Sequence, residues 1–277
     1  MSTDVLPRPR NRFRAERRFP TVPRMVQVAA IDHLEAGMVR VSFKGHELGE
    51  FTRDGTSFPA MESHAFDDVV ILCFPDPQTG EFFEPTVHET NNPPLSEVCA
   101  WQAREYTVRH LCQREKLLTV DFVLHSKGIA ESWLRSTVVG DHLGIIGTRM
   151  SRELPEQPHI LAIGDATALP ALARLVNSTP ESSCLRIFLL ADQESLGHSF
   201  PSSNHADITW VDPLRDPISQ LMQLLDDSPL QHGTWAWIAG EASQAGMIRR
   251  LLVDDHFLEK ERIHFTGYWK LNTPAIH

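Results

Sequence analysis

Apolar and polar side chains alternate over residues 22–52, where VPRMVQVAAID and GMVRVSF both have the period of a half-buried strand. Similar patterns predict strands at 67–75, 117–125 and 141–147, each ended by a Gly or Pro turn or a polar segment. Short strands separated by such turns are typical of a small antiparallel barrel. One helix is predicted within this part, at 128–138, and the segment 76–103, rich in Pro, Asn and Thr, is predicted to be a long loop.

After Arg152 strands alternate with helices. Strands are predicted at 158–164, 184–192, 206–213, 233–241 and 262–269, and helices at 168–178, 216–227 and 243–257. This alternation implies a parallel sheet with helices on both faces. We therefore predict two domains, an antiparallel barrel over residues 1–152 and an α/β nucleotide-binding domain over 153–277. This is the layout of ferredoxin reductase-type flavoenzymes, an analogy that does not fix the function.

Length and composition agree with two soluble globular domains: the chain has 277 residues, of which 42% are hydrophobic and 22% charged. No apolar run approaches the length of a membrane span, and the N-terminus lacks the apolar stretch of a signal peptide, so a cytoplasmic location is expected. The four cysteines are scattered without a CxxC pair. They predict neither a disulfide framework nor a metal site, and most are expected to be small buried hydrophobes.

The net charge of −10 is unevenly distributed. Residues 1–24 hold seven Arg against Asp4 and Glu16, a local charge of +5 that leaves −15 for the rest of the chain. A basic arm can bind nucleic acid. A strongly negative body repels a phosphate backbone, however, so we expect no nucleic-acid partner.

The most informative motif is Arg104-Glu105-Tyr106-Thr107, at the start of a predicted barrel strand. Alternation places Arg104, Tyr106 and Val108 on one face and Thr107 and Arg109 on the other. A flavin site needs a cation for the pyrophosphate, an aromatic ring to stack and a hydroxyl near the polar edge of the ring system, and this strand offers all three. The alternative is a plain edge strand with a surface Arg.

A second motif begins at Asp121-Phe122, continues to His125 and reaches a turn and helix at Gly128–Trp133. The first amides of a helix have no internal partner and can bind a phosphate, to which the Ser132 hydroxyl could add. The alternative for His125 is an ordinary core position.

Three further motifs each end a predicted strand of the α/β part, where doubly wound sheets gather their ligands. The first runs from Gly164 to Ala171; Thr167 is its better phosphate contact, and Asp165 is assigned to the flavin or nicotinamide neighbourhood or to helix capping. The second is Ala239-Gly240-Glu241 and the third Gly267-Tyr268-Trp269, whose aromatics could cover a flavin or plug the barrel. An N-capped helix without a ligand is the alternative at Asp165.

Together the patterns RxYT, DFxxH…GxAxxW, GDxTALPA, AGE and GYW resemble those of siderophore-interacting flavoproteins, including vibriobactin-utilisation proteins and ferric-siderophore reductases, over about residues 22–270. The resemblance implies FAD in the barrel, NADPH or NADH at the α/β domain, and reduction of iron(III) to iron(II), which a siderophore holds more weakly. FAD would carry the redox step, so no catalytic side chain and no metal site are expected. The cofactor-binding residues it implies are Arg104, Tyr106, Thr107, Val108, His125, Gly128, Ala130, Ser132, Trp133, Asp165, Thr167, Ala168, Leu169, Gly240, Glu241, Tyr268 and Trp269.

For the substrate, the resemblance implies that Arg149 and Arg262 attract an anionic ferric siderophore. At Ile71 the chain departs from the many relatives that have Lys, and its short tail after Trp269 is that of the subgroup preferring NADPH. Two other functions stay open. A flavin reductase could exchange electrons with a ferredoxin-type protein, and a binding module could hold a siderophore without reducing it.

Overall fold

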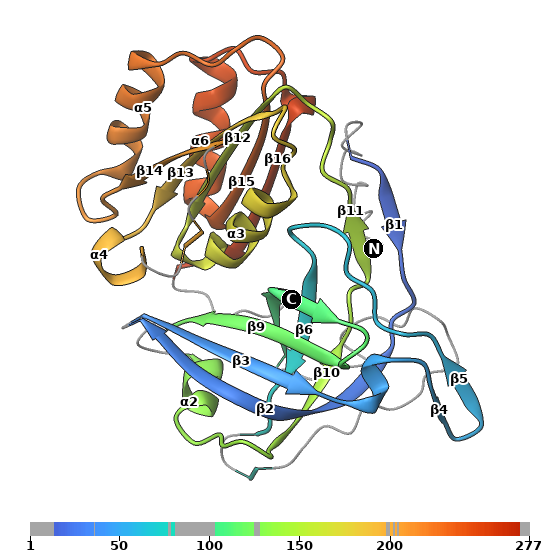
Figure 1. The fold of residues 1–277 in the computed structure, drawn as a ribbon. Coiled ribbons are helices and arrows are strands. Elements are labelled where there is room, and N and C mark those ends of the chain that lie inside the picture. Colours follow the sequence, from blue (N-terminus) through green and yellow to red (C-terminus); the bar gives the residue numbers. More distant parts are fainter. Residues whose placement is uncertain are drawn as a thin grey trace, which may run out of the picture.

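The computed structural model describes residues 14–35, 37–76, 79–80, 103–124, 128–197, 200–201, 203 and 205–271. Two sheets organise the molecule, a barrel-like antiparallel sheet and a parallel sheet packed above it (Figure 1). The predicted antiparallel barrel followed by an α/β parallel sheet is therefore confirmed. The predicted loop at 76–103 and His125 lie almost entirely outside the described residues.

The barrel sheet has seven strands, in which each inward-facing row of Val, Leu and Phe packs into one core. In spatial order they are β7 (Ala103–Thr107), β6 (Val69–Cys73), β10 (His142–Ile146), β2 (Pro23–Glu35), β3 (Met38–Lys44), β9 (Leu117–Val123) and β8 (His110–Cys112). The first and last of these, β7 and β8, are joined through only Val108 and Arg109. Since Arg109 N donates to Thr119 O of β9 at 2.9 Å, the sheet curls back on itself.

Helix α2 (Ile129–Leu134) covers the barrel end and is shorter than predicted. The Asp141 carboxylate accepts hydrogen bonds from the Thr137 hydroxyl (3.1 Å) and the Val138 amide (2.9 Å). These bonds draw the chain into a turn toward β10, so the helix cannot continue to residue 138.

The α/β domain is a five-stranded parallel sheet, as predicted, with helices on both faces. The strands are, in spatial order, β14 (Ala206–Val211), β13 (Cys184–Leu190), β12 (His159–Asp165), β15 (Trp235–Glu241) and β16 (Ile263–Trp269). Helix α3 (Leu169–Ser178) packs on one face, and α5 (Pro217–Asp227) and α6 (Ala242–Asp254) on the other. The short helix α4 (Gln193–Leu196) was not predicted; it follows β13 and is capped by Asp192.

Small elements complete the fold. Strand β1 (Glu16–Arg18) pairs with β11 (Met150–Arg152), and β4 (Phe51–Arg53) forms a hairpin with β5 (Thr56–Phe58). The 3-10 turns are η1 (His46–Leu48), η2 (Ala166–Ala168) and η3 (Lys260–Arg262). No helix in the described part of the chain is long and apolar enough to cross a membrane.

The two sheets share buried side chains. Met38 of β3 and Phe66 of the barrel side belong to the same apolar cluster as α3 and β12. Across the border, the Arg174 guanidinium of α3 donates to Val108 O at 2.6 Å and to Ser63 Oγ at 3.2 Å. Buried packing and hydrogen bonds together hold the α/β sheet against the flavin-motif strand β7.

The cysteines differ from expectation. Cys73 on β6 is buried, as expected, but it is disulfide-bonded, whereas Cys184 is a free and exposed thiol. Cys112 is free and half-buried. The scattered spacing, which predicted no disulfide framework, did not reveal this bond. A disulfide depends on how folding places two Cα atoms, which sequence spacing alone does not reveal.

Ile71 lies on the outward face of β6, away from the barrel core, yet it is only 3% exposed. It packs in a small cluster with Cys73, Ile146 and Ala103. We expect Ile71→Lys to lower the free energy of unfolding by about 3 kcal/mol or more, because a buried ammonium loses its hydration.

The matched control is Ile71→Val, for which loss of one methylene should cost about 1 kcal/mol. Urea unfolding followed by tryptophan fluorescence measures both. If the Lys variant were as stable as the Val variant, the side chain at position 71 would have a path to water or to a counter-charge.

Candidate active site

Strand β7 presents the predicted flavin motif. The Tyr106 ring packs against Phe122 with ring centroids 4.6 Å apart, and Val108 is fully buried in the same barrel core. Thr107 and Arg109 face the other way, toward the α/β domain, which confirms the predicted alternation.

Arg104 is half-buried at the start of this strand. Its guanidinium makes one hydrogen bond that the described residues show, to the carbonyl of its neighbour Ala103 at 2.7 Å. Burial lowers the pKa of Arg104, with a smaller opposing effect from Tyr106. A guanidinium that is half removed from water and bound to one carbonyl has donors left for an anionic group such as a pyrophosphate.

Tyr268 of β16 lies where the α/β sheet meets strand β7. Its buried hydroxyl faces Thr107 but forms no hydrogen bond of acceptable geometry within the described residues. Burial raises the pKa of Tyr268, and the nearby Asp67 carboxylate raises it further. A buried hydroxyl without a partner costs about 1–3 kcal/mol, so a ligand offering a polar edge between Tyr268 and Thr107 would be stabilised there.

Asp165 joins three of the predicted motifs at the carboxyl edge of the parallel sheet. Its Oδ1 accepts hydrogen bonds from the Thr167 amide (2.8 Å) and hydroxyl (2.5 Å). Its Oδ2 accepts from the Glu241 amide (2.9 Å) and from Trp269 Nε1 (2.8 Å). Of the roles considered for Asp165, the structure shows that it caps η2 and also ties β12 to β15 and β16.

Gly240 is required by this arrangement. It has φ +147°, a backbone conformation that side-chain-bearing residues rarely adopt. A Cβ at this position would lie 2.6 Å from Asp165 Oδ2. Next to it, Glu241 caps α6 by accepting from the Gln244 amide at 2.9 Å.

Three other predicted cofactor residues are buried and support the elements that form the site. Ala168 and Leu169 are buried at the start of α3, where a Cβ on Gly164 would come within 2.5 Å of the Ala168 side chain. Trp133 is buried in the barrel core, 5.4 Å from the Phe74 ring. These side chains support the turn and the helix in the described structure.

The exposed part of the second motif is the entry to α2. Gly128 and Ser132 are exposed, Ala130 is half-buried, and nothing lies within 4 Å of where a Cβ on Gly128 would be. Gly128 has an ordinary extended backbone (φ −176°), so no turn requires glycine here. The open space leaves room for a group to approach the backbone.

The two predicted substrate residues lie apart from the carboxyl edge. Arg149 is half-buried between β10 and β11, and its buried Nε has no hydrogen bond in the described structure. Arg262 precedes the first residue of β16 and donates to Gly233 O at 2.9 Å. Since Trp269 ends the same seven-residue strand, Arg262 lies about 20 Å from that edge.

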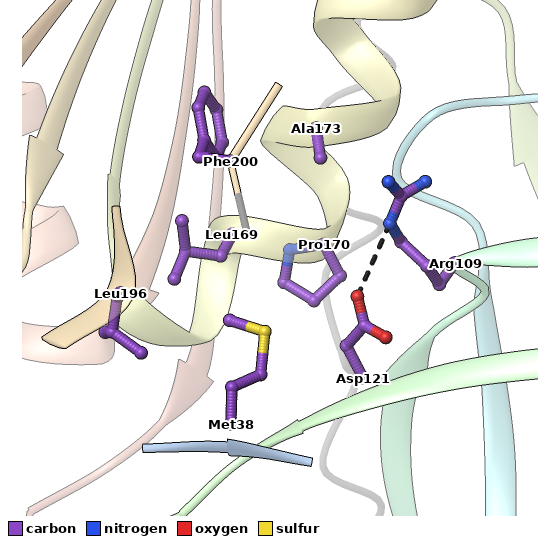
Figure 2. Close-up of a pocket in the computed structure, with 8 residues that line it drawn as sticks. All are labelled: Met38, Arg109, Asp121, Leu169, Pro170, Ala173, Leu196 and Phe200. Atoms are coloured by element: carbon purple, nitrogen blue, oxygen red, sulfur yellow. Dashed lines mark ion pairs between the residues drawn. The ribbon is translucent and has the colours of Figure 1, made fainter. Parts of the chain in front are cut away.

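A small pocket that was not predicted lies between the barrel and α3 (Figure 2). Most of its wall is apolar, and its polar side is Arg109 paired with Asp121 at 3.4 Å. Asp121 is also held by Arg40 through two bonds of 2.6 and 2.8 Å. The other lining residues are Met38, Leu169, Pro170, Ala173, Leu196 and Phe200.

Comparisons with known proteins cover both parts of the chain. Residues 27–152 match the siderophore-interacting FAD-binding domain, and residues 157–272 match the siderophore-interacting protein model. The chain is 26% identical over 271 residues to the ferric vibriobactin reductase ViuB of Vibrio cholerae, with 92% of this chain and 93% of that protein covered. It is also 26% identical over 281 residues to the NADPH-dependent ferric-chelate reductase of Escherichia coli, covering 95% and 97%.

Among solved structures, a siderophore utilization protein from T. fusca superposes with a TM-score of 0.80 at 28% identity, covering 95% of this chain and 98% of that one. The ferredoxin reductase of carbazole 1,9a-dioxygenase has a TM-score of 0.61 at 14% identity and shares the fold alone. The barrel and parallel-sheet layout is thus that of ferredoxin reductase-like proteins.

Proposed function

The chain belongs to the siderophore-interacting protein family, and from that premise we propose that it is an FAD-dependent NAD(P)H:ferric-siderophore reductase acting in the cytoplasm. Its barrel is a siderophore-interacting FAD-binding domain, and its relatives include ferric-siderophore and ferric-chelate reductases. In this proposal residues 1–152 bind FAD and residues 153–277 receive NAD(P)H.

One observation carries the proposal: motifs far apart in the chain converge at the border of the two sheets. Tyr268 of β16 faces Thr107 of β7, and Asp165 binds both Trp269 and the Glu241 amide. The carboxyl edge of a parallel sheet is where such folds bind nucleotides. A siderophore-binding module without redox chemistry would have no use for this arrangement.

The residues present fit FAD. Arg104 would hold the pyrophosphate with its remaining donors, and the entry to α2 offers open backbone for a phosphate. The hydroxyls of Thr107 and Tyr268 would bind the polar edge of the flavin. When bound, FAD supplies the two-electron to one-electron conversion that NAD(P)H and iron(III) require.

The protein itself would contribute the positions of the bound cofactors and the electrostatics of their site. Asp165 holds the strand ends in one arrangement, and Tyr268 closes the α/β sheet onto β7. Iron(III) binds hard oxygen donors tightly and iron(II) binds them weakly, so reduction releases iron from an intact siderophore. No nucleophile or general base is needed for this step.

The test is anaerobic NADPH and NADH oxidation with a panel of ferric siderophores and an iron(II) trap. The proposal expects a yellow protein that oxidises NADPH or NADH when, and only when, a ferric siderophore is present. Two iron(II) ions should be trapped for each nucleotide that is oxidised. Reduction of a ferredoxin but of no ferric siderophore would favour the alternative flavin reductase. A protein that takes up no FAD would overturn the proposal.

Arg149 and Arg262 remain our candidates for recruiting an anionic ferric siderophore. We expect Arg149→Glu to raise KM for an anionic ferric catecholate by about tenfold or more at low salt, since the reversal changes the charge by two units and each unit at 4 Å from another is worth about 1 kcal/mol in water. The effect should shrink as salt rises, because dissolved ions screen the attraction between Arg149 and an approaching anion. Steady-state kinetics at two salt concentrations measure it.

A neutral ferric hydroxamate serves as the control substrate for Arg149→Glu, and its KM should stay within about twofold of the unsubstituted protein's. Equal KM changes for the neutral and the anionic complexes would rule out charge attraction by Arg149.

A further inference from the structure

Arg14 is buried between the barrel and the α/β sheet, although it belongs to the basic N-terminal arm. Its side chain is 0% exposed and forms two hydrogen bonds of 2.6 Å to the two oxygens of Asp67. It also donates to the carbonyls of Glu153, at 3.0 Å, and Arg152. Its guanidinium carbon lies 5.7 Å from the centre of the Trp235 ring.

Asp67 connects this arginine to the parallel sheet. Its Oδ2 accepts a hydrogen bond from Trp237 Nε1 of β15 at 3.2 Å and lies 3.8 Å from His264 Nε2 of β16. Burial alone would raise the pKa of Asp67, but Arg14, with smaller contributions from His264 and Trp237, lowers it overall. Burial lowers the pKa of His264 to about 4, so Arg14 supplies the positive charge of this cluster at neutral pH.

From Asp67 the contacts lead directly to Tyr268. The Trp237 ring packs edge-on against Phe66, at 5.4 Å, and against Tyr268, at 6.3 Å. The Tyr268 hydroxyl in turn faces Thr107 on β7. One tryptophan therefore separates the buried ion pair from the side chain that borders the flavin motif.

The arm is held in place beyond Arg14. Strand β1 pairs with β11, so that Glu16 lies opposite Arg152 and Arg18 opposite Met150. Strand β11 leads into the connection to β12, and the arm therefore lies along the crossing between the two sheets (Figure 1).

We propose that Arg14 and Asp67 form an interdomain clamp, a pair of positioning residues that holds Trp237 and Tyr268 against the flavin-motif strand. The proposal rests on the proposed function in one respect, that Tyr268 borders the bound flavin. The clamp gives part of the basic arm a role inside the molecule. It sets how the α/β sheet, which receives NAD(P)H in our proposal, packs against the flavin-motif strand, and it contacts neither NAD(P)H nor the flavin.

The experiment compares Arg14→Met, Arg14→Lys, Asp67→Asn and the double variant Arg14→Met/Asp67→Asn with the unsubstituted protein. Arg17→Met is the matched control, since Arg17 lies on the same arm but is 55% exposed, and its contacts, 3.8 Å to Glu62 and 3.3 Å to His64, are longer than those of Arg14 to Asp67. Hydrogen exchange of the β16 amides is measured on the protein as purified. Single-turnover reduction of the bound flavin by NAD(P)H and the Kd for FAD are measured alongside.

We expect Arg14→Met to speed exchange in β16 and to slow flavin reduction, each by about tenfold, while Kd for FAD changes less than about threefold. Arg14→Lys should recover part of the reduction rate because it keeps the charge. The double variant should be no slower than the slower single variant, since both changes break the same pair. Arg17→Met should leave all three quantities unchanged.

The proposal is overturned if exchange in β16 is the same in Arg14→Met and Arg17→Met. It is also overturned if the Arg14 and Asp67 variants lose thermal stability while their bound flavin is reduced at the normal rate. If Arg14→Met fails to fold, Arg14→Lys and Asp67→Asn carry the same comparison. If the unsubstituted protein takes up no flavin, the proposed function falls while hydrogen exchange still tests the clamp.

Discussion

Arg104→Ala should weaken FAD binding by about tenfold to a hundredfold. Hydrogen bonds to charged groups contribute about 1.5–3 kcal/mol each, and about 1.4 kcal/mol is a factor of ten in Kd. In the protein the Arg104 guanidinium is half-buried and bound to its neighbour's carbonyl, so its other donors are available to a pyrophosphate. Fluorescence titration of the flavin-depleted protein with FAD measures the change.

Arg149→Ala is the control for the loss of one arginine, and its Kd for FAD should stay within about twofold of the unsubstituted protein's. Arg149 lies between β10 and β11, and β6 separates β10 from the flavin-motif strand β7 in the sheet. If both variants lost affinity equally, the effect would come from net charge, and Arg104 would have no specific role at the flavin.

Asp165→Ala is expected to lower the unfolding temperature by about 6–12 °C. The carboxylate accepts four hydrogen bonds, from Thr167, Glu241 and Trp269, and its loss removes a cap and takes this acceptor from all four donors. We estimate a loss of about 3 kcal/mol, and each kcal/mol shifts the transition by about 2–4 °C in a chain of this size. Differential scanning calorimetry measures the shift.

Asp192→Ala is the matched control for capping, because Asp192 caps α4 and its bonds, from the Glu194 amide and from Ser195, stay within that turn. It should cost about 1 kcal/mol. The shift in unfolding temperature for Asp165→Asn should lie between those of Asp165→Ala and Asp192→Ala. An amide keeps one acceptor oxygen, but it places an NH₂ group opposite the remaining donors. Equal shifts for Asp165→Ala and Asp192→Ala would mean that the links to β15 and β16 add nothing to capping.

Asp165→Ala should also raise KM for the nicotinamide nucleotide, because the bond from Trp269 Nε1 orders the end of β16. A variant that unfolds earlier but keeps its KM would separate the stabilising role of Asp165 from any role in shaping the site.

The element order follows from the sequence alone because its causes are local. Period-two alternation predicted the strands around Val26 and Val41, and apolar spacing predicted the ends of α3 within one residue and those of α6 within three. Turn residues marked where strands end, and strand–helix alternation implied a parallel sheet with covered faces. The motifs also identified residues that meet in space, such as Asp165 and Trp269, because parallel strands end at one edge.

Tertiary structure decided what depends on pairs distant in the chain. Arg14 and Asp67 are separated by 53 positions, and neither stands in a local pattern that predicts an ion pair. The same dependence on residues distant in the chain applies to the disulfide at Cys73, to the core position of Trp133 and to the burial of Ile71 on the outward face of β6.

The physical reason is the range of the forces involved. Backbone propensity and hydrophobic period act within a few residues, so the sequence by itself determines which elements form and in what order. Burial, ion pairing and close packing depend on which surfaces the folded chain brings together. For this protein the sequence therefore determined the two sheets and the motifs at their edges, while only the tertiary structure showed that a buried arginine from the N-terminal arm joins them.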